Sequence, residues 1–152
     1  GFICGRRDLV AACAMQYAGI GRAMKVSKEA IAGLLTALDL YEKRDAAAAA
    51  RRDRERMEWL AGELNRIPGL RARLIQDEAG REIYRASVEV LPGAGITAAE
   101  LVRKLEDGDP AIYTRNHRLN LGIISIDPRP LRPGQEEIIL ARVREILEEV
   151  RA

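Results

Sequence analysis

The chain has 152 residues, of which 47% are apolar and 32% are charged, and this balance indicates a folded domain with a substantial core rather than a disordered chain. Aromatic residues make up only 4%, so aliphatic side chains must fill most of the interior, and platforms for stacking nucleic-acid bases are scarce. The net charge of +2 excludes a strongly basic, histone-like surface. No apolar run approaches the roughly 20 residues of a membrane-spanning helix, so we expect no membrane contact.

The first 44 residues predict one strand and two helices. Residues 1–5 are typical of the end of a strand, and a helix is expected over residues 6–16. Ser27 is a candidate N-cap of a second helix over residues 27–44. One strand cannot close a sheet, and the chain begins inside an apolar stretch. We therefore expect residues 1–44 to be the remnant of a large cofactor domain and the chain to be a piece of a longer protein.

The middle of the chain predicts one long, exposed helix over residues 46–66. Five alanines are followed by arginines that alternate with acidic residues, and then by an apolar stripe suited to packing. Pro68 and Gly69 end the helix. Because the charges of this segment balance, we interpret its arginines as a solvated surface rather than a nucleic-acid site. Residues 45–69 are thus predicted to form a connecting helix between two domains.

From residue 70 onward, apolar and polar residues alternate as in strands. The order strand, strand, helix, strand, strand, helix predicts an α+β fold for residues 70–152: a small domain built as an α/β sandwich, with an antiparallel-rich sheet and helices on one face. The expected elements are strands over 70–75 and 84–90, a helix that starts from a capping box at Thr97 and Glu100, strands over 111–116 and 119–126 with a possible bulge at Gly122, and a last helix that opens at Pro133.

Cysteine and histidine content limits the chemistry of the chain. Cys4 and Cys13 lie among apolar residues at a spacing that fits no zinc pattern, so we expect buried free thiols and a cytoplasmic protein. His117 is the only histidine, so no cluster of histidines can bind a metal. We predict no metal site.

The loop between the first two helices is one candidate site. It reads Gly19-Ile-Gly-Arg-Ala-Met-Lys25 and lies directly before the expected helix start at Ser27. Glycines permit a sharp bend, and backbone N–H groups together with two cations can bind a phosphate or a carboxylate. Arg22 and Lys25 are the candidate ligands, and the alternative is a solvated basic loop.

Arg115, His117 and Arg118 form a second candidate cluster, between two predicted strands of the small domain. His117 is suited to general acid or base catalysis by its ordinary pKa range, although the sequence names no partner for it. The alternative is a polar turn that meets water.

Several segments resemble the bacterial selenocysteine synthases and their relatives, which are aminotransferase-like, fold-type I pyridoxal phosphate enzymes. The similarity to the region after the cofactor lysine lies in GFICGRRDLV at the start of the chain, RAMKVSK at 22–28 and IAGLLTALDLY at 31–41. LVRKLEDGDP at 101–110, AIYTR at 111–115 and ISIDP at 124–128 resemble the small domain of the same superfamily. The D-glucosaminate-6-phosphate ammonia-lyase branch is the nearer match, because it is expected to carry a lysine at position 25 and Tyr-Thr-Arg at 113–115.

This resemblance implies a pyridoxal phosphate cofactor, held as a Schiff base by a lysine expected upstream of Gly1. The chain alone would then hold no catalytic residue and be inactive. Arg22 and Lys25 would bind an anionic group of the active site, and Arg115 the substrate carboxylate. Selenocysteine synthases carry Arg-x-x-Arg in this loop; Lys25 departs from that pattern, which puts selenium transfer more in doubt than anion binding.

Three functions follow as hypotheses. The leading one is the C-terminal part of a lyase that removes an α-proton and then eliminates and deaminates a phosphorylated amino sugar acid. The second is a selenium transferase acting on seryl-tRNA; a tRNA partner is expected only in that case. The third is a non-catalytic assembly domain, in which the apolar surface of Phe2, Ile3, Val10 and Ile20 would need a partner. For the enzymes, the resemblance implies a missing N-terminal cofactor domain and a homo-oligomer in the cytoplasm.

Overall fold

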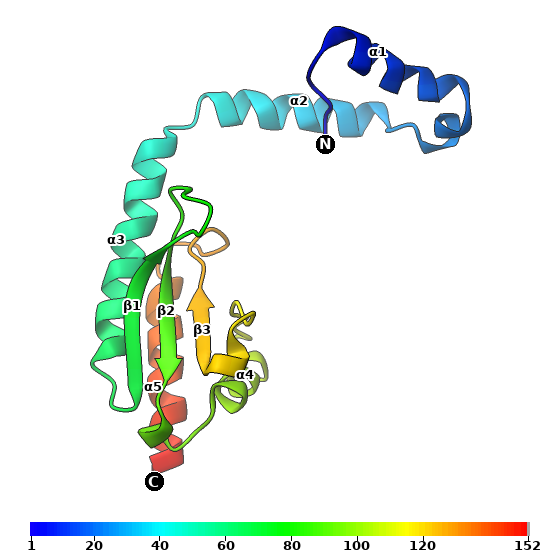
Figure 1. The fold of residues 1–152 in the computed structure, drawn as a ribbon. Helices are drawn as coiled ribbons and strands as arrows, with labels where there is room; N and C mark the ends of the chain where they lie inside the picture. The colour runs from blue at the N-terminus through cyan, green and yellow to red at the C-terminus, as the bar shows by residue number, and fades with distance from the viewer. Residues whose placement is uncertain (152) are drawn as a thin grey trace. The chain divides into compact units, whose positions relative to one another are not determined.

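The structure is a computed structural model that describes residues 1–151 (Figure 1). These residues divide into two compact units, Gly1–Asp45 and a second unit that begins at Ala46. The helix expected as a connecting segment belongs to the second unit, because it packs on the sheet of that unit. That the first unit is a remnant of a large cofactor domain stays a prediction.

Two helices and the short turns between them make up the first unit. Ser27 caps the second helix, since its Oγ accepts a hydrogen bond from the N–H of Ala30 at 3.2 Å. Both predicted helices are confirmed. The elements are α1 (Arg7–Met15), 3₁₀ turns over Gln16–Ala18 and Ile20–Met24, and α2 (Lys28–Glu42).

The strand expected over residues 1–5 is absent, because these residues have no regular secondary structure. A strand needs a neighbour for its N–H and C=O groups, and the described residues of the first unit offer none. The same lack of a core leaves Cys4 and Cys13 exposed, so the prediction of buried thiols was wrong. No residue of α1 or α2 is buried, and Phe2, Ile3 and Ile20 are 61%, 68% and 84% exposed.

The second unit is built on a three-stranded antiparallel sheet in the order β1-β2-β3. The pairing runs from Leu70 opposite Val90 to Gln76 opposite Tyr84, and Ala86 of β2 lies opposite Ile126 of β3. Alternating residues place aliphatic side chains on one face and polar side chains on the other. The strands are β1 (Leu70–Gln76), β2 (Tyr84–Val90) and β3 (Ile123–Ile126).

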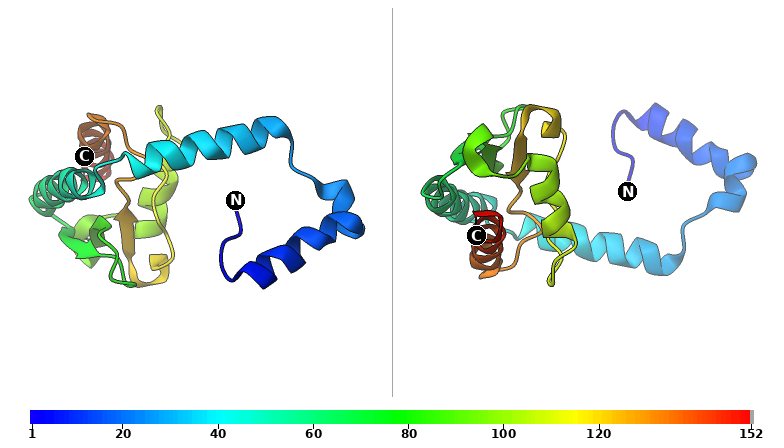
Figure 2. Two further views of the ribbon diagram at one scale, coloured as in Figure 1. Left: turned by 90° about the horizontal axis from the view of Figure 1, so that it is seen from above. Right: turned by 90° about the horizontal axis from the view of Figure 1, so that it is seen from below.

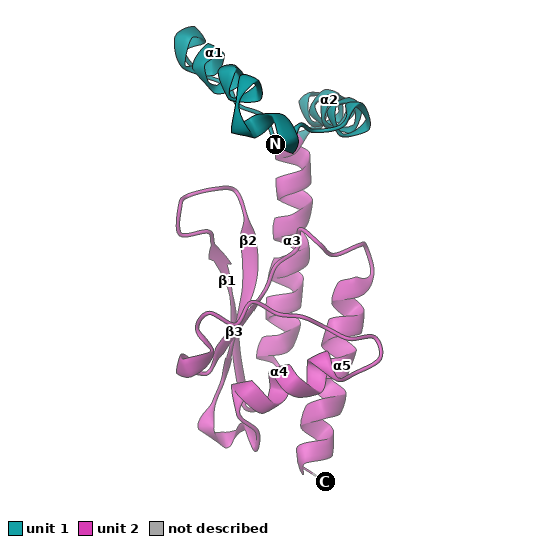
Figure 3. Ribbon diagram, turned by 90° about the vertical axis from the view of Figure 1, so that its right-hand side faces the viewer, with its two compact units in different colours: residues 1–45 teal, residues 46–152 magenta. Residues whose placement is uncertain are grey.

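Three helices cover the aliphatic face of this sheet and lie on the same side of it (Figures 2 and 3). α3 (Ala46–Asn65) packs on β1 and β2, α5 (Gln135–Arg151) packs beside α3, and α4 (Ala98–Glu106) packs on α5. The α+β fold with helices on one face is confirmed. The largest fully buried apolar side chains are Met57, Leu60, Leu64, Leu101, Leu105, Ile124, Ile146, Leu147 and Val88.

The long helix α3 is buried along its apolar stripe, and most of its charged residues are exposed. The predicted stripe at 57, 60 and 64 is fully buried against the sheet, as its helical spacing requires. Of the arginines expected to be solvated, Arg56 instead forms a two-point ion pair with the buried Glu136 of α5, both N–O distances being 2.6 Å. The helix is therefore fixed to the second unit by its apolar stripe and by this buried pair.

Of the predicted strands over 111–116 and 119–126, only residues 123–126 are confirmed, as β3. The N–H of Ile112 donates to the C=O of Leu105 at the end of α4, and residues 119–121 form a 3₁₀ turn closed by local bonds. Only Arg115 remains to pair with β3, through a single bridge to Ser125. Gly122 is not a bulge; its φ of 73° ends the 3₁₀ turn in the left-handed region that favours glycine.

Candidate functional site

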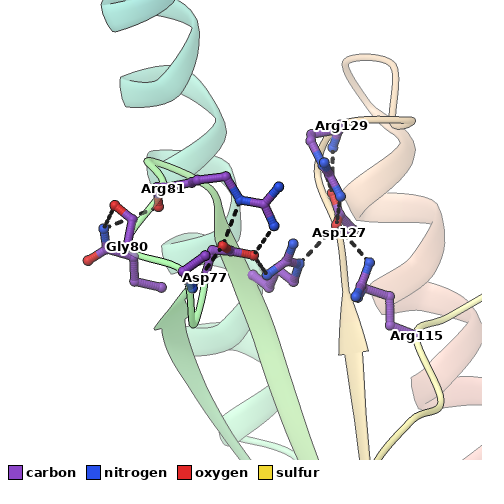
Figure 4. A network of polar contacts seen from close by, with 9 residues as sticks. Asp77, Gly80, Arg81, Arg115, Asp127 and Arg129 are labelled. Atoms are coloured by element: carbon purple, nitrogen blue, oxygen red, sulfur yellow. Dashed lines mark hydrogen bonds and ion pairs between the residues drawn. The ribbon is translucent and has the colours of Figure 1, made fainter.

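Charged side chains collect at one end of the sheet, where β1 ends, β2 begins and β3 ends (Figure 4). Asp77 directly follows β1, Arg85 is the second residue of β2, and Asp127 directly follows β3. Antiparallel pairing brings these three positions together, although Asp127 is 42 positions from Arg85 in the sequence.

Arg85 lies at the centre of this cluster and bridges two carboxylates. It donates from Nη1 to Asp77 at 3.0 Å and from Nε to Asp127 at 2.9 Å, and all three side chains are less than one tenth exposed. Each carboxylate also binds an outer arginine: Arg81 donates to Asp77 at 2.8 and 3.0 Å, and Arg129 donates to Asp127 at 2.8 and 2.7 Å. The buried charges are therefore paired and hydrogen-bonded.

The two carboxyl groups are held in their charged form. Hydrogen bonds from Arg81, and secondarily from Arg85, lower the pKa of Asp77 well below its usual range. Burial would raise the pKa of Asp127, but the bonds from Arg129 and Arg85 outweigh it, so this pKa is also well below its usual range. Neither carboxyl carries a proton to donate near neutral pH, so the pair orients arginines rather than performing acid catalysis.

Arg115 approaches this cluster from the segment that precedes the 3₁₀ turn. Its backbone N–H and C=O both bond to the backbone of Ser125 of β3, at 2.8 and 3.1 Å. These two bonds fix the position of the backbone from which the Arg115 side chain extends. The guanidinium lies 3.7 Å from Asp127 and the side chain is 43% exposed. One side of Arg115 therefore faces a fixed carboxylate, and the rest is accessible to a ligand.

Two pockets meet at Arg115, which is the one residue common to both linings. The larger has a volume of about 680 Å³ and mainly aliphatic walls, among them Leu131 and Ile139, with Asp127 and Arg129 beside them. The smaller has a volume of about 280 Å³ and a charged lining. Its charged residues are Asp77, Glu78, Arg81, Arg85, Arg115, His117 and Arg118.

The structure thus brings together the three predicted residues Arg115, His117 and Arg118 at the smaller pocket. His117 is exposed and Arg118 is partly buried. Within residues 1–151, neither side chain has a hydrogen-bond or ion-pair partner. Substrate binding by His117 or Arg118 stays a prediction.

Arg22 and Lys25 lie in the first unit and are both exposed. Arg22 is in the second 3₁₀ turn, and Lys25 follows it, with Nζ 5.8 Å from the ring centroid of Tyr17 in a cation–π contact. A Cβ at Gly21 would lie 2.8 Å from the C=O of Gln16, so the sharp bend requires glycine at this position. In the described part of the chain no ion pair involves either cation, and their anion binding stays a prediction.

Sequence reasoning missed five residues that build the site: Asp77, Arg81, Arg85, Asp127 and Arg129. The sequence does contain a signal for them. Arg85 lies at a strand position that faces away from the core, and Asp127 directly follows the neighbouring strand, so the register places both at the same end of the sheet. The register itself was not available, since the pairing partner of β2 was predicted to be a longer strand.

The described residues fit the binding of anionic groups and not the covalent attachment of pyridoxal phosphate. The chain has four lysines, and none lines either of the pockets that share Arg115. Lys104 is paired with Glu149 at 3.1 Å, while Lys25, Lys28 and Lys43 lie on the first unit. Across residues 1–151, no group of three or more His, Cys, Asp or Glu side chains is placed to hold a metal ion, and no helix is long and apolar enough to span a bilayer.

Comparison with known proteins found no family model that matches the chain. A 5'-C-glycyluridine monooxygenase-decarboxylase from Streptomyces sp is 49% identical over 148 residues, which are 97% of this chain and 37% of that protein. The D-glucosaminate-6-phosphate ammonia lyase of Salmonella typhimurium is 40% identical over 149 residues, 97% of this chain and 39% of that protein. A solved structure of D-glucosaminate-6-phosphate ammonia-lyase matches with a TM-score of 0.78 at 38% identity, over 97% of this chain and 39% of that chain. The chain spans less than two fifths of the length of these relatives.

Proposed function

We propose that this chain, which corresponds to a C-terminal portion of the D-glucosaminate-6-phosphate ammonia-lyase family, is the substrate-binding part of a pyridoxal phosphate-dependent lyase. Its substrate would be a phosphorylated amino sugar acid. The rest of the enzyme, including the lysine that holds the cofactor, would come from the part of the relatives' length that this chain does not span. Assembly as a homo-oligomer and a cytoplasmic location belong to the same proposal.

The observation that carries the proposal is the placement of Arg115. Its backbone is bonded to Ser125, and its side chain lies 3.7 Å from Asp127, is 43% exposed, and borders two pockets. A planar guanidinium with free N–H donors binds a carboxylate through two parallel hydrogen bonds. A glucosaminate carries an amino group next to a carboxylate, and a decarboxylase acts on a carboxyl group, so the names of both relatives denote substrates with the group that Arg115 would hold.

In this mechanism the residues of the chain bind and orient the substrate. Arg115 would hold the carboxylate, while Asp127 keeps the guanidinium in place and is itself fixed by Arg85 and Arg129. The aliphatic walls of the larger pocket would exclude water from the reacting carbon. When bound, pyridoxal phosphate supplies an electron sink that lets the proton next to the amino group leave, so that water and then ammonia can be released.

Arg22 and Lys25 would bind an anionic group, as the helix start at Ser27 and the glycine-dependent bend favour. Their substitution would act on binding rather than on proton transfer. In the assembled enzyme, Arg22→Ala would therefore raise the Michaelis constant for the substrate.

A second candidate is oxidative decarboxylation of a glycyl-bearing nucleoside, because the Streptomyces relative has the higher identity, 49% against 40%. Both reactions begin at the carbon between an amino and a carboxyl group, so Arg115 would have the same role in each. The selenium-transferase and assembly-domain hypotheses stay open, without a comparable observation in their favour.

A chimaera tests the proposal. This chain would replace the matching region of the Salmonella enzyme, and ammonia release from D-glucosaminate-6-phosphate would be measured, with carbon dioxide release from 5'-C-glycyluridine as the second assay. We expect ammonia release, and Arg115→Ala should raise the Michaelis constant by about 10–100-fold, because a charged hydrogen bond contributes about 1.5–3 kcal/mol. Arg103→Ala is the matched control, since Arg103 is exposed on α4 and lines neither pocket. A folded chimaera that releases only carbon dioxide, or that is unaffected by Arg115→Ala, would refute the proposal.

A further inference from the structure

We infer that the smaller pocket beside Arg115 binds the phosphate group of the substrate whose carboxylate Arg115 holds. This inference rests on the proposed function for the role of Arg115. It adds the residues that would bind the second anionic end of the substrate. These are Arg118 and His117, which line the pocket together with the loop between β1 and β2.

The lining of the smaller pocket has an excess of basic side chains. Four arginines and His117 line it, against the two acidic residues Asp77 and Glu78. Asp77 is already bound by Arg81 and Arg85, and Arg115 has only a 3.7 Å contact to an acid outside the pocket. Within residues 1–151, Arg118 and His117 have no side-chain partner, so their hydrogen-bond donors remain free for an anion.

The backbone holds these free donors in a fixed arrangement. Arg115 is bridged to Ser125, and the C=O of Arg118 accepts bonds from the N–H groups of Leu121 and Ile123, at 3.0 and 3.2 Å. The facing loop is fixed by the ion pairs of Asp77. Donors that are already in place need less ordering when a ligand binds, which favours affinity.

The donors and the size of the pocket point to phosphate. A phosphate monoester carries nearly two negative charges and three acceptor oxygens, which match an arginine fork and an imidazole better than a second carboxylate does. The volume of about 280 Å³ lies just below the usual range of pockets for whole small molecules, about 300–1,000 Å³, and admits a single group. The larger pocket is a poorer phosphate site, because its Arg129 is already bound by Asp127 at 2.7 Å.

The single histidine makes the pocket directly observable. The ring C–H protons of His117 give the only histidine signals of the chain in a proton NMR spectrum, so they need no assignment. Inorganic phosphate, gluconate and 6-phosphogluconate would be titrated at constant pH and ionic strength, with chloride as the salt reference. We expect a saturable shift with phosphate and at least tenfold tighter binding of 6-phosphogluconate, because its carboxylate then reaches Arg115 intramolecularly.

Three variants test which arginines are responsible for the binding seen in the His117 signals. Arg118→Ala should weaken phosphate binding by about tenfold or more. Arg115→Ala should remove the advantage of 6-phosphogluconate over phosphate. Arg103→Ala removes one exposed arginine of α4 that does not line the smaller pocket, and it should change neither result. The side chain of Arg118 has no partner to lose within residues 1–151, and the urea midpoint of each variant would verify its fold.

Three results would overturn the inference: no saturable shift, an equal response to chloride, or equal losses in Arg118→Ala and Arg103→Ala. A fourth result would also overturn the inference: if 6-phosphogluconate binds no tighter than phosphate, the pocket and Arg115 do not bind the two ends of one substrate. None of these bears on ammonia release by the chimaera. Conversely, an inactive chimaera with an intact His117 response would refute the proposed lyase and leave phosphate binding at this pocket established.

Discussion

Replacing Arg85 by Met tests whether buried charge holds the end of the sheet together. The Arg85 side chain joins Asp77 and Asp127 at 3.0 and 2.9 Å, and each of the three side chains is less than one tenth exposed. Methionine fills much of the same volume but removes the charge and both hydrogen bonds. Two buried carboxylates would then retain their outer partners, Arg81 and Arg129, and Asp127 its 3.7 Å contact to Arg115.

The expected loss is about 3 kcal/mol in the free energy of unfolding. Removing one partner of a buried ion pair costs about 3–5 kcal/mol. We expect the lower end of this range because each carboxylate keeps two hydrogen bonds from a second arginine. With a urea dependence of about 1–3 kcal/mol per molar, the midpoint of unfolding should fall by roughly 1–3 M.

Urea unfolding followed by the fluorescence of Trp59 measures this loss. Trp59 is the only tryptophan and lies on α3, so it reports the second unit. Arg71→Ala is the matched control: Arg71 bonds across the same pair of strands to Glu89 at 3.2 Å, but the two side chains are 65% and 37% exposed. An exposed pair of this kind contributes less than about 1 kcal/mol.

The pH dependence supplies a second check with a definite sign. The folded-state pKa values of Asp77 and Asp127 are lowered, so their contribution to stability is present above the unfolded value of about 3.9 and is lost as pH falls below it. Arg85→Met weakens the stabilisation of the charged carboxylates, so its deficit relative to the unmodified chain should shrink between about pH 5 and pH 3. The buried-charge argument fails if the deficit is the same at pH 3 and pH 7, or if it does not exceed that of Arg71→Ala.

Two further substitutions probe the frame around the site. Arg56→Ala leaves the buried carboxylate of Glu136 without its two-point partner and should cost about 3 kcal/mol in urea unfolding, of which Arg56→Lys should recover less than half. Gly69→Ala should lower the melting temperature by about 10 °C in calorimetry, because Gly69 has a φ of 83° and an added Cβ would lie 2.5 Å from Cα of Ala94. Gly80→Ala, at a φ of 74° with open space around it, should lose clearly less; equal losses would show that the close approach is not the cause.

Local signals in the sequence were sufficient for the helices and for the first two strands. The capping box of α4 is present as predicted, with Thr97 and Glu100 each accepting a bond from the backbone of the other. The alternation in β1 matches the observed burial over residues 70–73, since it reflects one covered face. In β2 residues 85–88 are all buried, because Arg85 and Ser87 are covered on the polar face as well. The last helix begins at Gln135, two residues after the predicted start at Pro133.

Features that depend on distant partners were not predictable in the same way. The strand expected over residues 1–5 needs a neighbouring strand that the first unit does not offer among its described residues. The segment around Arg115 alternates like a strand, yet its neighbours satisfy their backbone groups locally or on α4. The link from Arg85 to Asp127 spans 42 positions and depends on a register that no local pattern specifies. Sequence reasoning therefore found Arg115, but not the residues that hold it in place.

The contact between α3 and α5 has a consequence for how the second unit is made. Glu63 of α3 bonds to Arg144 of α5 at 2.9 Å, and Arg56 and Glu136 are separated by 80 positions. α3 and α5 thus contribute to one core on the same face of the sheet. The unit can therefore close only after α5 has been synthesised, so a truncation that removes α5 should leave the whole unit unfolded.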